Sequence, residues 1–360
     1  MRFSLYIFVI FLFSLVFTAC QTAEKLDVFG LVSKKKSSVK LEGKVGDLLL
    51  VATEDFWASA LSDSLKSMLE IPMQPALQLE PRLNLYSSSY KNFYAYQSKR
   101  RNVLAISFSD KQENTKVLRK KTAVLGQCFY QIDAPTVQAL LIYTNTHKDS
   151  LVGLFETCEK QRLLAQVQEN YDANLYSYFF NRFGLGLYLP QGSFISIEEE
   201  NFVFLQRNRS RSLTFKDVET KKMRNQSHDV LQGFMIYRLP YKDTADFHLD
   251  HIIAKRDSLL KKIPLEKENA YFYTLYKDSL FNGSFYDPKE KNVWFKGAYA
   301  KEVRGIFQSK NYNMGGMFIA LYFLSADKKY MIALDAYVYA PKFGKREYLR
   351  ELESILYASE

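Results

Sequence analysis

The stretch GMFIALYFL (316–324), SADKK (325–329) and YMIALDAYVYA (330–340) decides the fold class of this chain. Two apolar, aromatic-rich runs with a five-residue polar connection predict a β-hairpin. Both faces of the first run are apolar, so we expect that strand to lie inside a sheet covered by helices. Pro341 ends the second run, and apolar side chains at helical spacing predict a final helix over 345–357.

The body of the chain begins with a strand followed by a helix. Asp47 to Ala52 is a short apolar run typical of a buried strand, and Thr53 is placed to cap a helix that Pro72 ends. Similar patterns predict a second strand at 102–108 and helices at 135–143 and 149–183.

The order of strand and helix recurs in the second half. Strands are predicted at 194–197, 202–206 and 233–239, followed by a helix at 247–263. We therefore predict an α+β fold: a two-lobed body of mixed sheet with covering helices. The predicted lobes are residues 44–187 and 188–360, with a seam near Tyr188.

The composition is that of a folded protein. Of 360 residues, 47% are hydrophobic, 15% aromatic and 24% charged, which excludes a disordered, collagen-like or disulfide-stapled chain. The nine Pro and 15 Gly residues are too few for long low-complexity linkers.

The N-terminus has the layout of a signal peptide. After Arg2, no charged residue occurs from Phe3 to Ala19, which matches a basic n-region followed by an apolar h-region. The segment Phe17-Thr18-Ala19-Cys20 resembles a bacterial lipobox, with small residues before a Cys that is diacylated. We therefore predict a signal peptide at 1–19, lipid on Cys20, and a polar tether up to residue 43.

The mature chain is basic. Without Arg2, 48 Lys and Arg residues face 39 Asp and Glu residues. In the cell envelope a basic protein meets anionic lipid headgroups, acidic glycans or cell-wall polymer, and nucleic acid is not a normal neighbour there. We predict a membrane-anchored location in a bacterial envelope, facing the periplasm, with an envelope protein or an anionic polymer as partner.

Two cysteines remain beyond Cys20. Cys128 and Cys158 would be able to pair in an oxidising compartment, but their spacing does not establish a bond. Cys158 shares a helical face with Leu151 and Phe155, and we favour a buried free thiol there.

Five arginines are candidate contacts for an anionic ligand or a partner: Arg207, Arg209, Arg211, Arg304 and Arg346. The first three fall in the polar stretch 206–229, which we predict to be a long loop that either grips an anion or is a solvated excursion. For the other two we favour structural ion pairs over bidentate ligand binding.

Motifs for catalysis or metal binding are weak. His248 and His251 lie three apart near Lys255, and a solvated helix face is favoured over a metal site. The three glutamates 198–200 lie between two predicted strands, so we expect them in a hairpin turn with solvated side chains. The chain contains no G-x-S-x-G, Walker or HExxH pattern, so we predict no catalytic residue, metal or cofactor.

Several short segments together indicate a family resemblance: 43–47, Arg256-Asp257, Arg304-Gly305, 314–316 and 340–346. In this order and spacing they resemble a Bacteroidetes-type lipoprotein family of unknown function, over about residues 43–358. The resemblance implies an envelope lipoprotein and assigns no activity.

We expect a non-enzymatic binding or assembly factor in the envelope. The alternatives are a hydrolase that acts on an envelope polymer, with dispersed active-site residues, and a lipoprotein that captures a small ligand.

Overall fold

The computed structural model describes residues 40–359 apart from 76–77, 217, 219 and 278–285. The predicted signal peptide, Cys20 and most of the tether lie outside the described residues. Within the described residues, no helix is both long enough and apolar enough to span a membrane.

The first lobe contains a five-stranded sheet in the order β2-β1-β3-β5-β4. Its strands are β1 (Asp47–Ala52), β2 (Asn84–Ser89), β3 (Asn102–Phe108), β4 (Lys116–Arg119) and β5 (Cys128–Ala134). All neighbours are parallel except β4, which runs antiparallel to β5. The predicted strands at 47–52 and 102–108 are thus confirmed.

Helices cover both faces of this sheet. They are α2 (Glu54–Ala58), α3 (Leu61–Leu69), α4 (Tyr90–Asn92), the π-helical turn η1 (Phe93–Gln97) and α5 (Val137–Glu169). One face packs against α3 and α5 through Leu65 and Phe155, and the other against Phe93 of η1. Thr53 caps α2 as predicted, since its hydroxyl accepts the Phe56 N–H at 3.3 Å.

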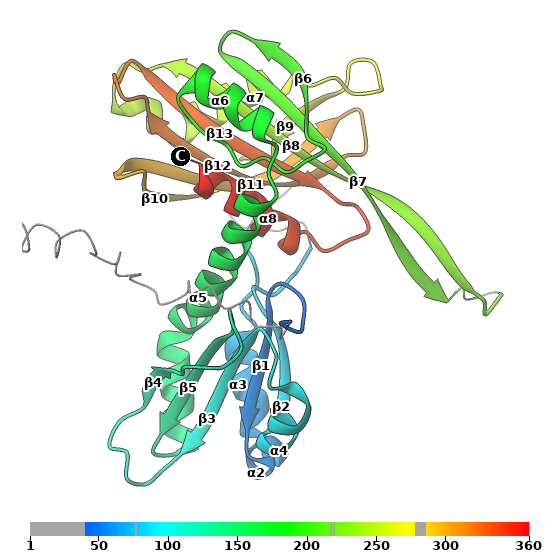
Figure 1. Ribbon diagram of the computed structural model, residues 1–360. Coiled ribbons are helices and arrows are strands. Elements are labelled where there is room, and N and C mark those ends of the chain that lie inside the picture. The colour runs from blue at the N-terminus through cyan, green and yellow to red at the C-terminus, as the bar shows by residue number, and fades with distance from the viewer. Residues whose placement is uncertain (1–39, 76–77, 217, 219, 278–285, 360) are drawn as a thin grey trace, which may run out of the picture.

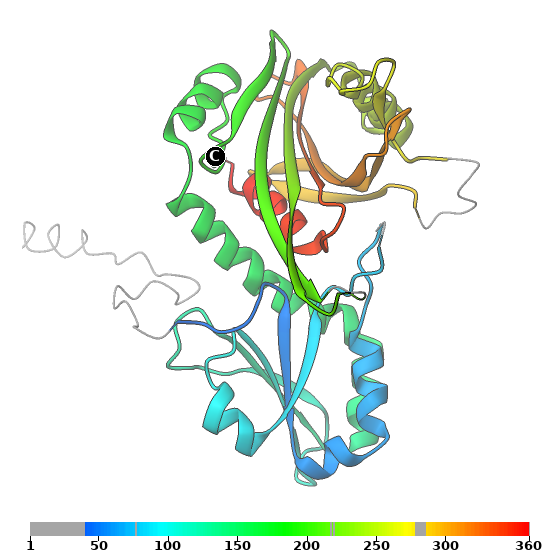
Figure 2. The same cartoon turned by 90° about the vertical axis from the view of Figure 1, so that its right-hand side faces the viewer.

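The second lobe contains an eight-stranded antiparallel sheet in the order β10-β11-β12-β13-β8-β7-β6, with β9 paired to β11. The strands are β6 (Phe194–Glu199), β7 (Phe202–Lys216), β8 (Met223–Pro240), β9 (Tyr271–Thr274), β10 (Lys289–Phe295), β11 (Ala298–Lys310), β12 (Gly315–Leu324) and β13 (Tyr330–Tyr339). The helices of this lobe are α6 (Ala173–Phe183), the 3₁₀ turn η2 (Thr244–Phe247), α7 (Leu249–Leu260) and α8 (Arg346–Ala358). Figure 2 shows that the sheet is strongly curled.

The hairpin of β12 and β13 is central to this sheet, as the sequence predicts. Alternate side chains of the two strands enter two different cores, one covered by α8 and α6 and the other by α7. Ile319 lies in the first of these cores and Phe318 in the second, so β12 is buried on both faces. The α+β fold class and the final helix are confirmed.

Helix α5 connects the lobes (Figure 1). Its 33 residues span about 50 Å. Phe155 packs into the core of the first lobe, whereas Val167 packs into the second. The helix predicted at 149–183 is interrupted because Asp172 accepts two backbone N–H groups and starts α6. Phe179 of α6 already belongs to the core of the second lobe.

The stretch 206–229 is not a loop, contrary to our prediction. β7 and β8 stay paired from Phe202↔Tyr237 to Lys216↔Met223, and they extend past the sheet as a two-stranded arm (Figure 1). The polar side chains satisfy one another across the strands, as in the 2.6 Å hydrogen bond between Ser210 and Ser227. Cross-strand pairs of this kind stabilise a ribbon without an apolar alternation.

Candidate functional site

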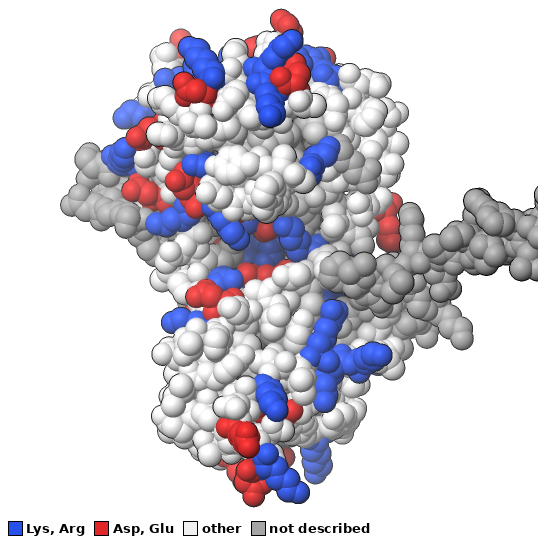
Figure 3. All heavy atoms as spheres, turned by 90° about the vertical axis from the view of Figure 1, so that its left-hand side faces the viewer, with Lys and Arg blue, Asp and Glu red and all other residues white. Residues whose placement is uncertain are grey.

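A cleft of about 690 Å³ lies where the two lobes meet. Three kinds of element line it: the loop of residues 71–74 with Arg82, the middle of α5, and the facing surfaces of α8, β10 and β11. In Figure 3 basic and acidic side chains gather in a hollow between the two lobes. We call this hollow the interlobe cleft.

On one side of the cleft, Arg82 holds two carboxylates of α5. It donates to Asp149 at 2.7 Å and to both oxygens of Glu156 at 3.1 and 2.6 Å. Arg350 of α8 donates to the same Glu156 at 3.0 Å and to the carbonyl of Arg82 at 2.7 Å. Glu156 therefore joins the first lobe to α8.

On the other side, Arg304 of β11 is the centre of a second network. It forms a fork with Glu302, with donor–acceptor distances of 2.7 and 3.1 Å, and lies 3.0 Å from Glu353. Tyr357 donates to Glu302 at 2.6 Å. Lys160 reaches across from α5, with its ammonium 3.2 Å from the centre of the Tyr357 ring and 3.5 Å from Glu353.

Burial and charge act against each other in this network. Loss of water lowers the pKa of Lys160, and Glu353 and Glu302 compensate only in part. Burial by itself would raise the pKa of Glu353, but the charges of Arg304 and Lys160 outweigh it and hold that pKa below its usual value. The carboxylate of Glu353 is therefore ionised and acceptor-only at neutral pH.

The cleft carries a surplus of positive charge. Its five cations are Arg82, Lys160, Lys291, Arg304 and Arg350, and its four carboxylates are Asp149, Glu156, Glu302 and Glu353. Each carboxylate has a cationic partner at 3.5 Å or less. Lys291 is exposed and has no salt-bridge partner within the described residues. Such a cleft suits a ligand that carries a carboxylate or a phosphate, and it offers no unpaired carboxylate as a general base.

Below the cleft, Glu80 attaches the first lobe to the start of α8. Its carboxylate accepts the backbone N–H groups of Lys345 and Arg346 at 2.7 and 3.0 Å. The guanidinium of Arg346 donates to the carbonyl of Pro81 at 2.8 Å and to Asn84 at 2.9 Å. A carboxylate at a helix N-terminus is favourable. Arg346 is buried and its two terminal nitrogens donate to protein oxygens, so its role is structural.

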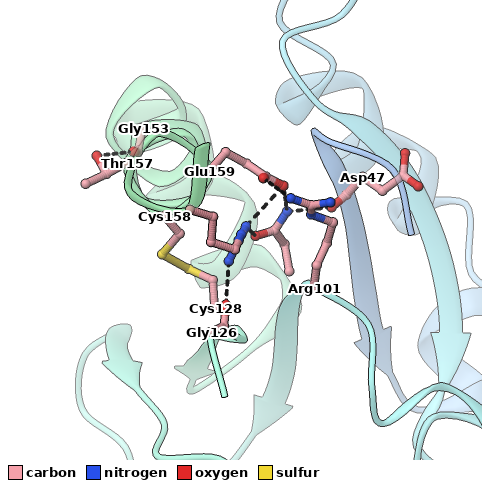
Figure 4. Close-up of a disulfide and its surroundings, with 10 residues drawn as sticks. Asp47, Arg101, Gly126, Cys128, Gly153, Thr157, Cys158 and Glu159 are labelled. Atoms are coloured by element: carbon pink, nitrogen blue, oxygen red, sulfur yellow. Dashed lines mark hydrogen bonds and ion pairs between the residues drawn. A yellow bond between two sulfur atoms is a disulfide. The ribbon is translucent and has the colours of Figure 1, made fainter. Parts of the chain in front are cut away.

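A third ionic cluster holds α5 on the first sheet, around Glu159 (Figure 4). This buried carboxylate accepts from Gly46 N–H at 3.1 Å, Asn102 at 2.6 Å and Arg101 at 2.6 Å, and it forms an ion pair with Arg162 at 3.1 Å. Burial by itself would raise the pKa of Glu159, but the two arginines and the two N–H donors outweigh it and lower that pKa.

Cys128 and Cys158 form a disulfide, with their Cα atoms 6.2 Å apart (Figure 4). The predicted free thiol at Cys158 is therefore wrong. Cys158 is buried as expected, but the parallel pairing of β5 with β3 brings Cys128, at the start of β5, next to α5. A spacing of 30 residues cannot show that proximity.

The five predicted arginines do not form one site. Only Arg304 lines the cleft. Arg207 and Arg209 both donate to Glu351 of α8, at 3.0 and 2.9 Å, and Arg211 donates to the Tyr348 hydroxyl at 2.9 Å. These three fasten the root of the β7–β8 arm to α8.

The weaker sequence candidates lie on solvated surfaces. His248 precedes α7 as its N-cap residue, and its ring centre lies 6.4 Å from that of His251, with both side chains exposed. Glu198 accepts from Tyr178 at 2.6 Å at the turn between β6 and β7, which confirms the predicted hairpin position of the acidic run. Among the described residues, no three His, Cys, Asp or Glu side chains are grouped to hold a metal ion.

Sequence reasoning missed most of the cleft. Glu302, Glu353 and Tyr357 lie more than 140 residues from Lys160. One signal was present: Asp149, Gly153, Glu156 and Lys160 recur at helical spacing and form a polar stripe beside the apolar stripe of α5.

Comparison with known proteins gives two family matches. Residues 172–358 match the model of a domain of unknown function (DUF4837), and residues 42–168 match that of another domain of unknown function (DUF8532). No curated protein matches the chain. Among solved structures, a mutant of protein Mog1 is 9% identical over 49% of this chain and 89% of its own, with a TM-score of 0.26. That value is too low to support an argument.

Proposed function

The chain belongs to the family of DUF4837, and we propose that this member is a membrane-anchored lipoprotein of the bacterial envelope that binds an envelope partner without catalysis. The anchor is a lipid on Cys20, at the end of the apolar segment 3–19. The Cys128–Cys158 disulfide supports a location outside the cytoplasm, because such bonds persist in oxidising compartments.

The interlobe cleft carries the proposal of binding. Its carboxylates are all paired with cations, and its surplus charge is positive. Clefts between domains are among the preferred places for ligands. An acidic segment of a partner protein would place a carboxylate against Lys291 and Lys160, where it gains charge-assisted hydrogen bonds.

Site-specific crosslinking in cells tests this function. A photo-crosslinking residue replaces Thr157, which is exposed on α5 in the cleft, in the full-length lipidated protein. Thr146 is a matched control: it is exposed on the same helix and likewise donates its hydroxyl to the carbonyl four residues earlier. We expect one protein partner to be captured from position 157 and not from 146, and capture to be reduced by Lys291→Glu.

Two results would overturn the proposed function. The first is the same capture from both positions, or recovery of the protein with only glycan or lipid attached. The second is substrate turnover by the purified protein that is abolished by a single substitution in the cleft.

A second candidate function is capture of a small anionic ligand. The cleft volume of about 690 Å³ falls within the usual range for small-molecule sites. A ligand that raises the unfolding temperature of the wild type but not of Lys160→Gln would favour this candidate. The hydrolase alternative gains no support from the cleft, since each carboxylate there has a cationic partner.

A further inference from the structure

The β7–β8 arm extends well beyond the sheet from which it grows (Figures 1 and 2). The last pair between β6 and β7 is Phe194↔Gln206, and the last between β13 and β8 is Tyr339↔Leu231. Eight further residues of β7, 209–216, therefore form a ribbon with β8 alone and reach about 26 Å. Its root is fastened to α8 by Arg207, Arg209 and Arg211.

The outer end of the arm is apolar, whereas its middle is polar. Phe215, Val218 and Met223 are 43%, 80% and 66% exposed. Closer to the root the exposed side chains are polar or charged, and some of them bond across the strands, such as Thr214 to Asn225 at 2.5 Å. Three large apolar side chains at the end of a projection are thus left in water, which is costly unless something covers them.

Positive charge surrounds these apolar side chains. Lys216, Lys221, Lys222 and Arg224 lie within the same nine residues, against the two acids Asp217 and Glu219 in the sequence. The tip therefore carries an excess of two positive charges. Apolar side chains flanked by Lys and Arg are the combination that enters the boundary of an anionic bilayer.

The tether makes this bilayer reachable. Residues 20–39 connect Cys20 to the described body and span at most about 70 Å when extended. The folded body would therefore stay close enough to the membrane for the tip of the arm to reach the bilayer. Lipid on Cys20 would also raise the local concentration of bilayer around the tip.

We propose that the tip of the β7–β8 arm inserts Phe215, Val218 and Met223 into the headgroup boundary of an anionic membrane, as a second contact beside the lipid on Cys20. This inference rests on the membrane anchor of the proposed function. The two contacts together would orient the interlobe cleft relative to the membrane surface.

Fluorescence in vesicles tests the inference. Full-length lipidated protein is reconstituted into vesicles of phosphatidylcholine, with or without phosphatidylglycerol, and floated on a density gradient. An environment-sensitive dye is attached at Val218→Cys or, as control, at Ser212→Cys nearer the root of the same arm. Labelling is specific because Cys128 and Cys158 are bonded to each other and Cys20 carries lipid in the proposal.

We expect the dye at position 218, and not at 212, to be quenched by lipid-attached quenchers in vesicles that contain phosphatidylglycerol. Phe215→Ser/Met223→Ser and Lys221→Gln/Lys222→Gln should each lose this quenching while the protein still floats. Floating protein whose tip dye stays unquenched would overturn the inference and leave the anchor standing. Protein that does not float would overturn both the anchor and the inference.

Discussion

Removing the Cys128–Cys158 disulfide is expected to lower the free energy of unfolding substantially. The two cysteines are separated by 30 residues, and a cross-link over that separation removes unfolded-state entropy worth about 3.6 kcal/mol at 25 °C. The bond joins the start of β5 to the middle of α5, so the loss should fall on the first lobe.

Urea unfolding followed by tryptophan fluorescence measures this loss. Trp57 reports on the first lobe, because it packs against that core and donates its indole N–H to the Ser88 carbonyl at 2.7 Å. Trp294 in the second lobe is 79% exposed and should change little on unfolding. We expect reduction to lower the urea midpoint by between about 1 and 4 M.

A double variant separates the cross-link from the reducing agent. Cys128→Ala/Cys158→Ala should unfold close to the reduced wild type, and the reductant should not change its midpoint. The reasoning is refuted if oxidised and reduced wild type unfold at the same urea concentration, or if the reductant shifts the variant equally.

Three further predictions concern buried charge and backbone. Glu159→Gln should lower the free energy of unfolding by about 3–5 kcal/mol in urea at pH 7, because it leaves two half-buried guanidinium groups without their buried carboxylate. In the folded protein the pKa of Glu159 is lowered from its usual value near 4.5. The stability that its charge contributes is therefore complete above pH 4.5 and is lost as the pH falls through the lowered pKa. A difference in unfolding free energy between wild type and Glu159→Gln that stays unchanged in acid would contradict this. Gly46→Ala should lower the free energy of unfolding, measured by calorimetry, by about 1–3 kcal/mol, because the φ of Gly46 is +82° and an added Cβ would lie 2.7 Å from a guanidinium nitrogen. The control Gly153→Ala, where an added Cβ on α5 meets open space, should be neutral or stabilising. Arg256→Met should cost about 3–5 kcal/mol by breaking its buried pair with Asp335, and Arg256→Met/Asp335→Leu should regain most of it in urea unfolding; strictly additive losses would argue against the pairing.

Local patterns were sufficient for much of the fold. The hairpin of β12 and β13 has two apolar runs around a polar turn, and α8 has an apolar face at helical spacing, so both were predictable. The start of the chain body was predictable for the same reason, since an apolar run precedes the capping hydroxyl of Thr53.

Features that depend on tertiary partners were not predictable. Residues 207–216 have no apolar alternation. Their strand depends on pairing with β8 and, at Arg207, Arg209 and Arg211, on hydrogen bonds to Glu351 and Tyr348 of α8. The interlobe cleft depends in the same way on contacts between α5 and α8, whose charged side chains lie about 190 residues apart in the sequence. Hydrophobic periodicity describes one helix or strand at a time, so it contains no information about contacts between residues that lie far apart in the sequence.

Three consecutive residues of α5 show how the first lobe shapes the cleft. Cys158 is bonded to Cys128 at the start of β5, Glu159 is held by the cluster at the amino ends of β1 and β3, and Lys160 points into the cleft against Tyr357. A helix fixed on two sides within one turn cannot rotate without breaking the disulfide or the buried ionic cluster. The backbone position of Lys160 is therefore set by the first lobe, while Tyr357 and Glu353 of the second lobe hold its ammonium. A partner that binds between the lobes therefore meets a cation that is already in place before binding. This favours affinity because little side-chain ordering remains to be done.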